Sequence, residues 1–505
     1  MPNPPGLCYN LFMPARYYSP QGRVRILLSR CEVLRHTGET DRAQQDARQA
    51  LELACQSKLP GAQAECLMML ADVHDQQGEM QAMRHEALAA MDLYHRLGDR
   101  SGESQAVGQI GIAVNYLEGP RAARPHYEQA LTIARTLGDR SRLLGCLLEM
   151  GWILIRTEEY ENARRHLVEG LDMARSEKDL FLEAFGTSCL GEVALHQGRP
   201  EEALALHQRA LAIRQQIGDK WFEAITWSWL STDWEALGDY GKARKACERS
   251  LALYRSVGNV WETAGILWQM GRLSGSCGDV SRAVSCFCEE LAIREQSGRP
   301  DYISNSWAHL SEAYFFQGDW PRAEAATQSA LSGSPALPEK VQAALTLARL
   351  ALIQGDRILA FGRLREAEDP VTASRNKALL FDLRSDWADF HLANREASSV
   401  RKALEALHAL LPEQKGKHAE PRLELLAACL LACEGDAVEA ETVFANALSP
   451  LQEMGLRWEE ARSHLRFGRA LGREKGHSYL QTAQALFSET GAAGWAALCD
   501  QALNS

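Results

Sequence analysis

The sequence repeats with a period of forty residues from about Gln21 to Leu331, and no insertion disturbs the count over eight units. A short turn closes each unit, and it recurs at Gly98-Asp99, Gly138-Asp139, Lys178-Asp179, Gly218-Asp219, Gly258-Asn259 and Gly298-Arg299. A small residue recurs at Cys31, Ala71, Gly111, Gly151, Gly191, Ser231, Gly271 and Ser311. A fixed period of this length is typical of a repeat architecture, in which each unit is one supersecondary element.

Each unit predicts two helices, because apolar residues recur at three- and four-residue spacing on both sides of a central turn. The second segment carries its own small-residue position, usually alanine, at Ala43, Met83, Ala123, Ala163, Ala203, Ala243, Ala283 and Ala323. Small residues at fixed helical positions allow two helix axes to approach closely. One pair cannot bury its apolar face, so the units must stack, and we expect each unit to contact only its neighbours.

These positions resemble the tetratricopeptide repeat family, whose pattern has a small residue late in the first helix and alanine twice in the second, as in Gly111, Ala123 and Ala130. The usual unit of that family is shorter. The forty-residue unit is similar to the variant in kinesin light chains and in the sensor regions of large bacterial transcriptional activators of the maltose-regulon activator type. The resemblance implies an all-α fold, a right-handed superhelical α-solenoid of about twelve antiparallel helix pairs.

The spacing of prolines and glycines divides the chain into four parts. Residues 1–20 predict a flexible lead-in or a strap over the first helices, and residues 21–335 hold the eight regular units. Residues 336–420 predict degenerate helical repeats, and residues 421–505 predict further repeat units with a capping helix, because Ala428, Gly435, Ala440 and Ala447 keep the original offsets.

Composition limits the partners. The net charge is −11, and acidic and basic residues are interleaved, so no basic surface for nucleic acid is expected. No apolar run approaches the ~20 residues of a membrane span, and no signal peptide is visible. The odd number of cysteines, 13, favours reduced thiols and a cytoplasmic protein.

No catalytic motif is present. The sequence contains no phosphate-binding GxxxxGK[ST] motif. The close thiol pairs Cys286/Cys288 and Cys429/Cys433 lack the four-ligand set of a structural zinc site, so packing is the preferred interpretation. We therefore expect no enzyme activity, no metal and no cofactor.

The expected binding surface is the inner face of the first helices, which lines a concave groove in the resembling family. Aromatic and arginine side chains contribute much of the binding energy in interfaces. Twelve residues fall on this face: Asn115, Tyr116, Trp152, Arg156, Glu192, Glu235, Trp268, Arg272, Asn305, Glu312, Phe315 and Phe316.

Two functions fit this pattern. The first is a protein–protein interaction scaffold that binds a partner segment, from another protein or a peptide, in the groove. The alternative is a ligand- or peptide-sensing regulatory module of a bacterial signalling or transcription-control system, in which binding changes curvature or self-association.

Overall fold

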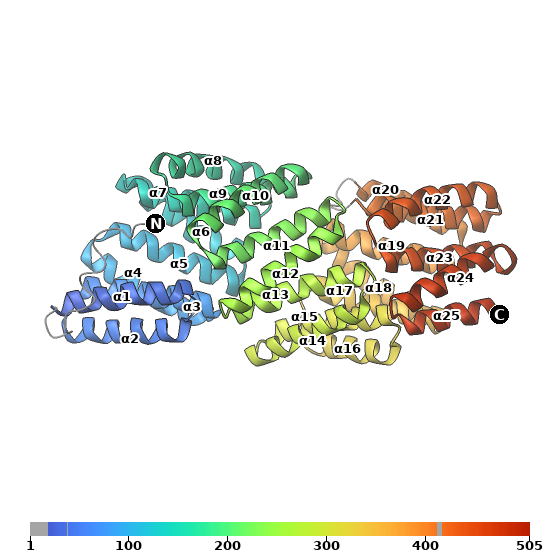
Figure 1. The fold of residues 1–505 in the computed structure, drawn as a ribbon, viewed down its shortest axis with the longest axis horizontal. Helices are drawn as coiled ribbons and strands as arrows, with labels where there is room; N and C mark the ends of the chain where they lie inside the picture. The colour runs from blue at the N-terminus through green and yellow to red at the C-terminus, as the bar shows by residue number, and fades with distance from the viewer. Residues whose placement is uncertain (1–18, 38, 412–416, 505) are drawn as a thin grey trace. The chain divides into compact units, whose positions relative to one another are not determined.

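The computed structural model describes residues 19–37, 39–411 and 417–504, and within these ranges all regular structure is helical (Figure 1). Residues 1–18 of the predicted lead-in lie outside the described ranges. The described helices are α1 (Pro20–Thr37), α2 (Thr40–Gln56), α3 (Pro60–Gln77), α4 (Met80–Leu97), α5 (Arg100–Glu118), α6 (Pro120–Leu137), α7 (Arg140–Arg156), α8 (Tyr160–Glu177), α9 (Leu180–His196), α10 (Pro200–Ile217), α11 (Lys220–Ala236), α12 (Tyr240–Ser256), α13 (Val260–Ser276), α14 (Val280–Ser297), α15 (Pro300–Gln317), α16 (Trp320–Ser332), α17 (Leu337–Ile353), α18 (Arg357–Ser374), α19 (Lys377–Ala393), α20 (Ala397–Leu410), α21 (Ala419–Glu434), α22 (Ala437–Glu453), α23 (Arg457–Leu471), α24 (Arg473–Glu489) and α25 (Ala493–Asn504).

These helices form twelve consecutive pairs followed by α25, so the prediction of an all-α repeat fold with about twelve helix pairs is confirmed for the described residues. We call the first helix of each pair, with an odd number, the A helix and the second the B helix. The chain divides into two compact units, each treated by itself below. Unit 1 is Met1–Trp229 with Ala252–Val260, and unit 2 is Leu230–Leu251 with Trp261–Ser505. Helices α11 and α12 both contribute to the two units. The finer boundaries expected at residues 335 and 420 stay predictions.

The repeated Gly-Asp turn ends one helix and begins the next. Gly138 has a left-handed backbone (φ +67°) and ends α6, and Lys178 has the same backbone at the end of α8. The aspartate that follows accepts a hydrogen bond from a backbone N–H of the next first turn, 3.0 Å for Asp139 and 2.9 Å for Asp179. This cap satisfies one of the orphan N–H groups at a helix start. A two-residue motif therefore fixes the repeat length.

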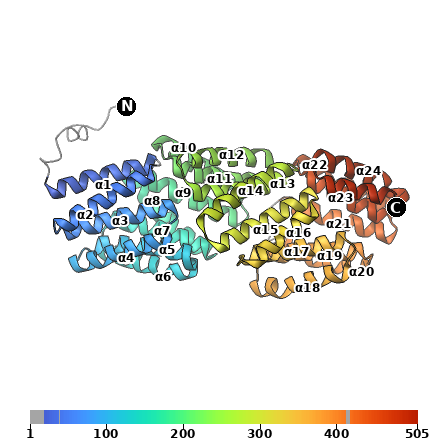
Figure 2. The ribbon, with the colours of Figure 1, turned by 90° about the horizontal axis from the view of Figure 1, so that it is seen from below.

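In unit 1 the small residues lie where helices cross. Ala123 and Ala163 have no exposed surface, and they join Leu167, Leu147 and neighbouring apolar side chains in one continuous core. A Cβ on Gly151 would lie 2.5 Å from Leu167 Cδ2, closer than atoms can approach. Consecutive A helices, such as α7 and α9, also contact one another. Figure 2 shows the resulting side-by-side stacking of successive helices from α1 to α8.

In unit 2 the last repeats return to earlier ones. The indole Nε1 of Trp495 on α25 donates to the Phe315 carbonyl of α15 over 2.8 Å, and Trp458 Nε1 on α23 donates to the Phe316 carbonyl over 3.2 Å. The expectation that each unit contacts only its neighbours is therefore wrong here. The physical reason is that Trp495 and Trp458 find buried apolar surface and a backbone acceptor on α15.

Three turns of unit 2, forty residues apart, lie against this returning segment. A Cβ on Gly238 would lie 3.1 Å from Met454 Sδ, and one on Gly278 would lie 2.6 Å from a methyl carbon of Thr490. A Cβ on Gly318 would lie 2.6 Å from the Cα of Gly494. The equivalent Gly198 in unit 1 has nothing within 4 Å of that position.

We therefore expect Gly318→Ala to destabilise unit 2 far more than Gly198→Ala destabilises unit 1. Both glycines have a left-handed backbone (φ +80° and +72°), so alanine costs roughly 1–2 kcal/mol of backbone strain at either turn. At Gly318 the methyl group also meets backbone atoms of α25, which adds roughly 1–3 kcal/mol. Urea unfolding of the two variants measures the difference. Equal free energies of unfolding would contradict the contact between the Gly318 turn and α25.

Candidate functional site

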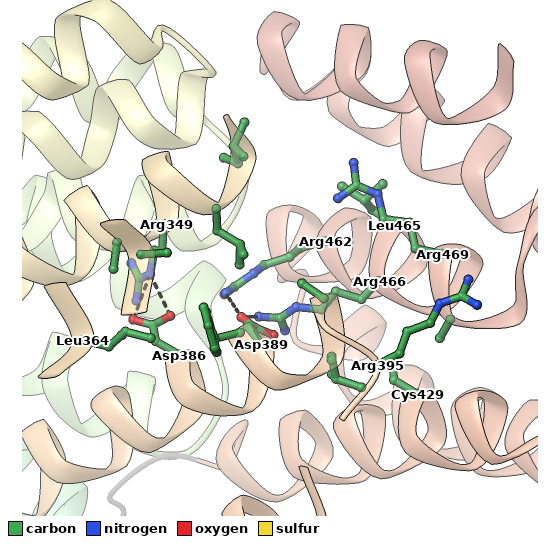
Figure 3. A pocket seen from close by; sticks show the side chains of 18 of the residues that line it. Arg349, Leu364, Asp386, Asp389, Arg395, Cys429, Arg462, Leu465, Arg466 and Arg469 are labelled. Carbon is green, nitrogen blue, oxygen red and sulfur yellow. Dashed lines mark hydrogen bonds and ion pairs between the residues drawn. The ribbon is translucent and has the colours of Figure 1, made fainter. Parts of the chain in front are cut away.

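A cavity of unit 2 with a volume of about 450 Å³ lies between its A helices and α25. Its walls come from α15, α17, α18, α19, α21, α23 and α25 (Figure 3). Phe315 and Trp495, which join α15 to α25, both line it. The return of the last repeats thus converts part of the expected groove into a half-open pocket.

One wall of the pocket carries an ion pair between α17 and α19. Arg349 Nε donates to both carboxylate oxygens of Asp386, over 2.9 and 3.1 Å. The Asp386 side chain is only 4% exposed. Burial alone would lower the pKa of Arg349, but Asp386 beside it raises that pKa above its ordinary value. This pair joins one positive and one negative charge.

A second ionic cluster joins α19 to α23. Arg462 Nη2 donates to Asp389 Oδ2 over 2.7 Å, and Arg466 donates to the same oxygen, so that both guanidinium groups point at one carboxylate (Figure 3). Burial, together with the like charge of Arg466, lowers the pKa of Arg462 to about 10, although Asp389 and Glu459 act in the opposite direction. Asp389 Oδ1 is buried and has no hydrogen-bond partner among the described residues. One carboxylate therefore faces two guanidinium groups.

Two further arginines line the pocket, Arg395 after α19 and Arg469 on α23. Both side chains are exposed, and neither forms an ion pair with a carboxylate in the described ranges. Arg462, Arg466 and Arg469 follow one another at spacings of four and three residues, which places them on one face of α23.

Beside the pocket, charges of alternating sign run along the A helices, and we call this row the charge ladder. Arg272 donates from two nitrogens to Glu235 over 2.5 Å, Arg349 binds Asp386, and Arg422 lies 3.4 Å from Glu459. Arg272 and Arg349 both act electrostatically on Glu312, which lies between them. In chain order the ladder comprises Glu235, Arg272, Glu312, Arg349, Asp386, Arg422 and Glu459.

The predicted binding residues of unit 1 lie on α5, α7 and α9. Tyr116 is 37% exposed and Arg156 is also exposed, whereas Asn115, Trp152 and Glu192 are half-buried. Trp152 packs edge-on against the Tyr127 ring, with 6.5 Å between centroids. The role of these residues in binding stays a prediction.

In unit 2 the structure brings several predicted residues together and covers others. Trp268 is 39% exposed, and its ring lies 5.8 Å from the Arg272 guanidinium carbon. Asn305 and Glu312 make contacts within the chain: Asn305 accepts from the Ala336 N–H over 2.9 Å, and Glu312 accepts from Gln342 over 2.5 Å.

The two predicted phenylalanines pack against the returning helices. Phe315 is buried against Trp495, with 5.3 Å between ring centroids, and Phe316 lies against Trp458, with 4.4 Å between centroids. Their surface is therefore used largely within unit 2, although Phe315 also lines the pocket.

The charged residues of the pocket itself were not among the residues predicted from the sequence: Arg349, Asp386, Asp389, Arg395, Arg462, Arg466 and Arg469. The sequence does contain a pattern that indicates the charge pairs between A helices. Residues of opposite charge recur at a spacing of 37 residues, in the pairs Glu235 and Arg272, Arg349 and Asp386, and Arg422 and Glu459. That spacing is one helical turn less than the repeat, and it makes the charges neighbours on adjacent A helices.

The buried histidine His309, on α15, predicts a pH dependence of the free energy of unfolding. His309 Nδ1 lies 3.2 Å from Glu290 Oε2, and its Nε2 lies 3.8 Å from Glu339 Oε1. Burial alone would lower the pKa of His309, but the hydrogen bonds to Glu290 and Glu339 raise it to about 9.

This pKa lies above the value of ~6.5 for a histidine in an unfolded chain. The stabilisation by protonated His309 is therefore complete below a pH of ~6.5 and is lost as the pH rises through about 9. We expect the stability difference between the wild type and His309→Gln to shrink over this range. Urea unfolding at a series of pH values measures it. Parallel pH profiles for the two proteins would contradict the protonated state of His309.

Within the described residues, no group of three or more histidine, cysteine, aspartate or glutamate side chains could hold a metal ion. None of the described helices is long and apolar enough to cross a membrane. The twelve cysteines of the described ranges are free thiols. Among them, burial raises the pKa of the Cys429 thiol, which lines the pocket, to about 12, so this side chain is a neutral wall residue.

Fold and site together define a helical-repeat protein with a charged, half-open pocket in its second unit. Residues 183–256 match the tetratricopeptide repeat family, which confirms the predicted tetratricopeptide repeats over this segment.

The chain is similar to two curated proteins over part of its length. It is 28% identical over 255 residues to the regulatory protein AfsR of Streptomyces griseus, covering 50% of this chain and 25% of AfsR. It is 23% identical over 312 residues to the kinesin light chain-related protein 3 of Arabidopsis thaliana, covering 58% of this chain and 47% of that protein. The chain thus spans a quarter to about half of the length of these relatives.

Solved structures with similar helices include a signal transduction ATPase with numerous domains that has a tetratricopeptide repeat sensor, from Pyrococcus horikoshii. It has 16% identity and a TM-score of 0.43, and the match covers 62% of this chain and 47% of that one. Another is the Rap conjugation gene regulator of plasmid pLS20 in complex with the Phr* peptide, with 13% identity and a TM-score of 0.46, covering 75% of this chain and 98% of that one.

Proposed function

We propose that this chain is a regulatory binding module, and that the pocket of unit 2 is where it recognises its ligand. The observation that carries this proposal is the cavity of about 450 Å³ between the A helices and α25, with its charged and apolar lining. Pockets of ~300–1,000 Å³ are typical of sites for small molecules and short peptide ends. Of the two functions that fit the sequence, ligand sensing is therefore preferred for unit 2.

The pocket is also placed to transmit binding. Its walls come from seven helices, including α15 and α25, whose contact closes unit 2. A ligand that contacts both sides stabilises the closed arrangement by its differential affinity for that arrangement. The named role of the Streptomyces griseus relative as a regulatory protein supports a regulatory output.

The scaffold function remains a second candidate, and one observation favours it. Trp268 is a large aromatic side chain with 39% exposure, beside the Arg272 guanidinium on α13. Exposed tryptophan and arginine together are typical of the centre of a protein interface. Under this hypothesis a partner segment contacts α13, and Trp268→Ala reduces capture of that partner while ligand binding in the pocket is unchanged.

Two replacements of an alanine by phenylalanine, one inside the pocket and one outside it, test the pocket. Ala393 on α19 lines the cavity, so Ala393→Phe places a ring in it; Ala373 on α18 is exposed outside it, so Ala373→Phe is the control. Thermal-shift screening of small molecules and short peptides against the full chain comes first. A ligand at a hundredfold excess over its dissociation constant stabilises by about 2.7 kcal/mol.

We expect ligands that stabilise the wild type to stabilise Ala373→Phe equally and to lose their effect on Ala393→Phe. Ligands that act on all three proteins alike would contradict binding in the pocket. We further propose that the chain acts without catalysis, binds neither nucleic acid nor membrane, and resides in the cytoplasm.

A further inference from the structure

We propose that the unit 2 pocket is a site for a small organic anion, with one phosphate or carboxylate group held by Arg462, Arg466 and Arg469 and an apolar body against the opposite wall. This inference rests on the proposed function and names the chemical class of its ligand. It is carried by the charges, donors and walls of the cavity.

The lining carries more arginines than carboxylates. Five arginines line the cavity, Arg349, Arg395, Arg462, Arg466 and Arg469, against the two aspartates Asp386 and Asp389. Arg349 and Asp386 neutralise one another, and Arg462 and Arg466 share the carboxylate of Asp389, which leaves Arg395 and Arg469 without an ion pair among the described residues. An excess of like charge in a partly desolvated site is unfavourable, and an anionic ligand relieves it.

The neighbouring charges behind the lining reduce this excess without removing it. Glu459 lies 3.9 Å from Arg462 and also pairs with Arg422 over 3.4 Å, and Arg422 is itself a cation. Asp382 faces Arg422 and Arg349. Among the described residues, neither Glu459 nor Asp382 forms an ion pair with Arg395 or Arg469.

The pocket offers guanidinium donors on α23. A guanidinium group carries five N–H donors in a planar fork, which suits the paired oxygens of a carboxylate or phosphate. Asp389 Oδ2 occupies one nitrogen of Arg462 and one of Arg466. Arg469 lines the same pocket from α23, and its side chain is exposed.

Part of the cavity wall is apolar. Leu352, Phe390, Leu392 and Trp495 line the cavity together with the arginines. A ligand that is only an ion leaves this surface in contact with water, whereas an aliphatic or aromatic body buries it, which stabilises the complex by about 25 cal/mol per Å². The cavity volume of about 450 Å³ limits this body to the size of a small metabolite.

The test measures binding of phenyl phosphate, benzoate, inorganic phosphate and the neutral benzyl alcohol to the full chain by calorimetry, at low and high salt. We expect phenyl phosphate, benzoate or both to bind, and benzyl alcohol to bind far more weakly. Affinity should fall at high salt, since the attraction is partly screened. Binding of phenyl phosphate alone identifies a phosphate ligand, and binding of benzoate alone identifies a carboxylate ligand.

Three variants locate the site. Arg469→Gln removes a cation that has no carboxylate partner, so it should leave folding intact and weaken anion binding roughly tenfold or more. Asp389→Asn removes the carboxylate that Arg462 and Arg466 share, so it should tighten anion binding while lowering the melting temperature of the free protein. Arg357→Gln, an exposed arginine of α18 outside the pocket, is the control and should change neither.

Anion affinity that is the same in Arg469→Gln, Asp389→Asn and the wild type would overturn the inference, as would the absence of binding by all three anions. If Ala393→Phe abolishes the effect of other ligands while these anions do not bind, the anion site is wrong and the binding pocket stands. If Ala393→Phe has no effect on any ligand, the proposed function fails as well. A protein partner that binds while the anions do not would likewise overturn the anion site.

Discussion

Replacing Trp495 by alanine is expected to lower the free energy of unfolding of unit 2 by about 3–5 kcal/mol, the usual cost of removing a buried tryptophan. Trp495 is 6% exposed and packs against the rings of Phe315, Trp458 and Phe487. Its Nε1 donates to the Phe315 carbonyl over 2.8 Å, so the substitution also leaves that acceptor without its partner. Urea unfolding followed by circular dichroism measures the loss.

Trp268→Ala is the matched control for this prediction. Trp268 on α13 is 39% exposed, so its replacement removes less buried surface than the replacement of Trp495. We expect it to cost no more than about 1 kcal/mol. Hydrogen exchange adds a second measurement: in Trp495→Ala the amides of α25 should lose protection before those of α17. If both tryptophan variants unfold at the same urea concentration, α25 does not hold the end of unit 2 closed.

The second large effect is expected at a helix crossing of unit 1, where Gly191→Leu should destabilise by about 3 kcal/mol through overpacking. A Cβ on Gly191 would lie 2.5 Å from Nε2 of His207. That ring is fully buried, stacks on Trp229 with 5.5 Å between centroids, and lies 3.1 Å from the Ser188 carbonyl. The ring therefore has no free space into which it can move.

Gly362→Leu provides the control, because Gly362 lies inside α18 and a Cβ there would meet nothing within 4 Å. Leucine is a better helix former than glycine, so this variant should be neutral or more stable by roughly 0.5–1 kcal/mol. The expected change in the free energy of unfolding thus differs in sign between the two glycine-to-leucine substitutions. Destabilisation of similar size at both positions would show that packing against His207 is not the cause.

The local architecture was predictable because its information is local. Gly151 and Gly191 lie forty residues apart, as do Ala123 and Ala163. A Cβ on either glycine would meet the facing helix at 2.5 Å, and both alanines are fully buried. The Gly-Asp turns likewise contain both the end of one helix and the cap of the next. Helix pairs, their order and their number follow from such signals.

The return of α25 onto α15 was not predictable from the same signals. Gly318 looks like Gly198 in the sequence, since both are the central glycine of a regular unit, yet only Gly318 meets another helix. The contact between Trp495 and Phe315 joins residues 180 positions apart. It depends on the small rotation added by every unit between them, and no single residue encodes that sum.

The side chains around the candidate site were predicted only in part, for the same reason. Registration with the resembling family placed Glu235 and Arg272 on the inner face of the first helices, and the structure shows that they form an ion pair. This registration could not show that Phe315 and Phe316 would be covered, or that Arg462, Arg466 and Arg469 would meet Asp389, because those contacts need the closed end of unit 2. Pairs of opposite charge 37 residues apart were the available signal for the remainder.

The charge ladder has a consequence for how many helix pairs unit 2 can contain. Each A helix from α11 to α23 presents the opposite sign to the next, from Glu235 through Arg272 and Glu312 to Glu459. Excising one pair brings two like charges face to face, as Glu235 and Glu312 would be without α13 and α14. Excising two consecutive pairs restores the alternation. Gain or loss of repeats in this unit should therefore be tolerated in even numbers and resisted in odd ones.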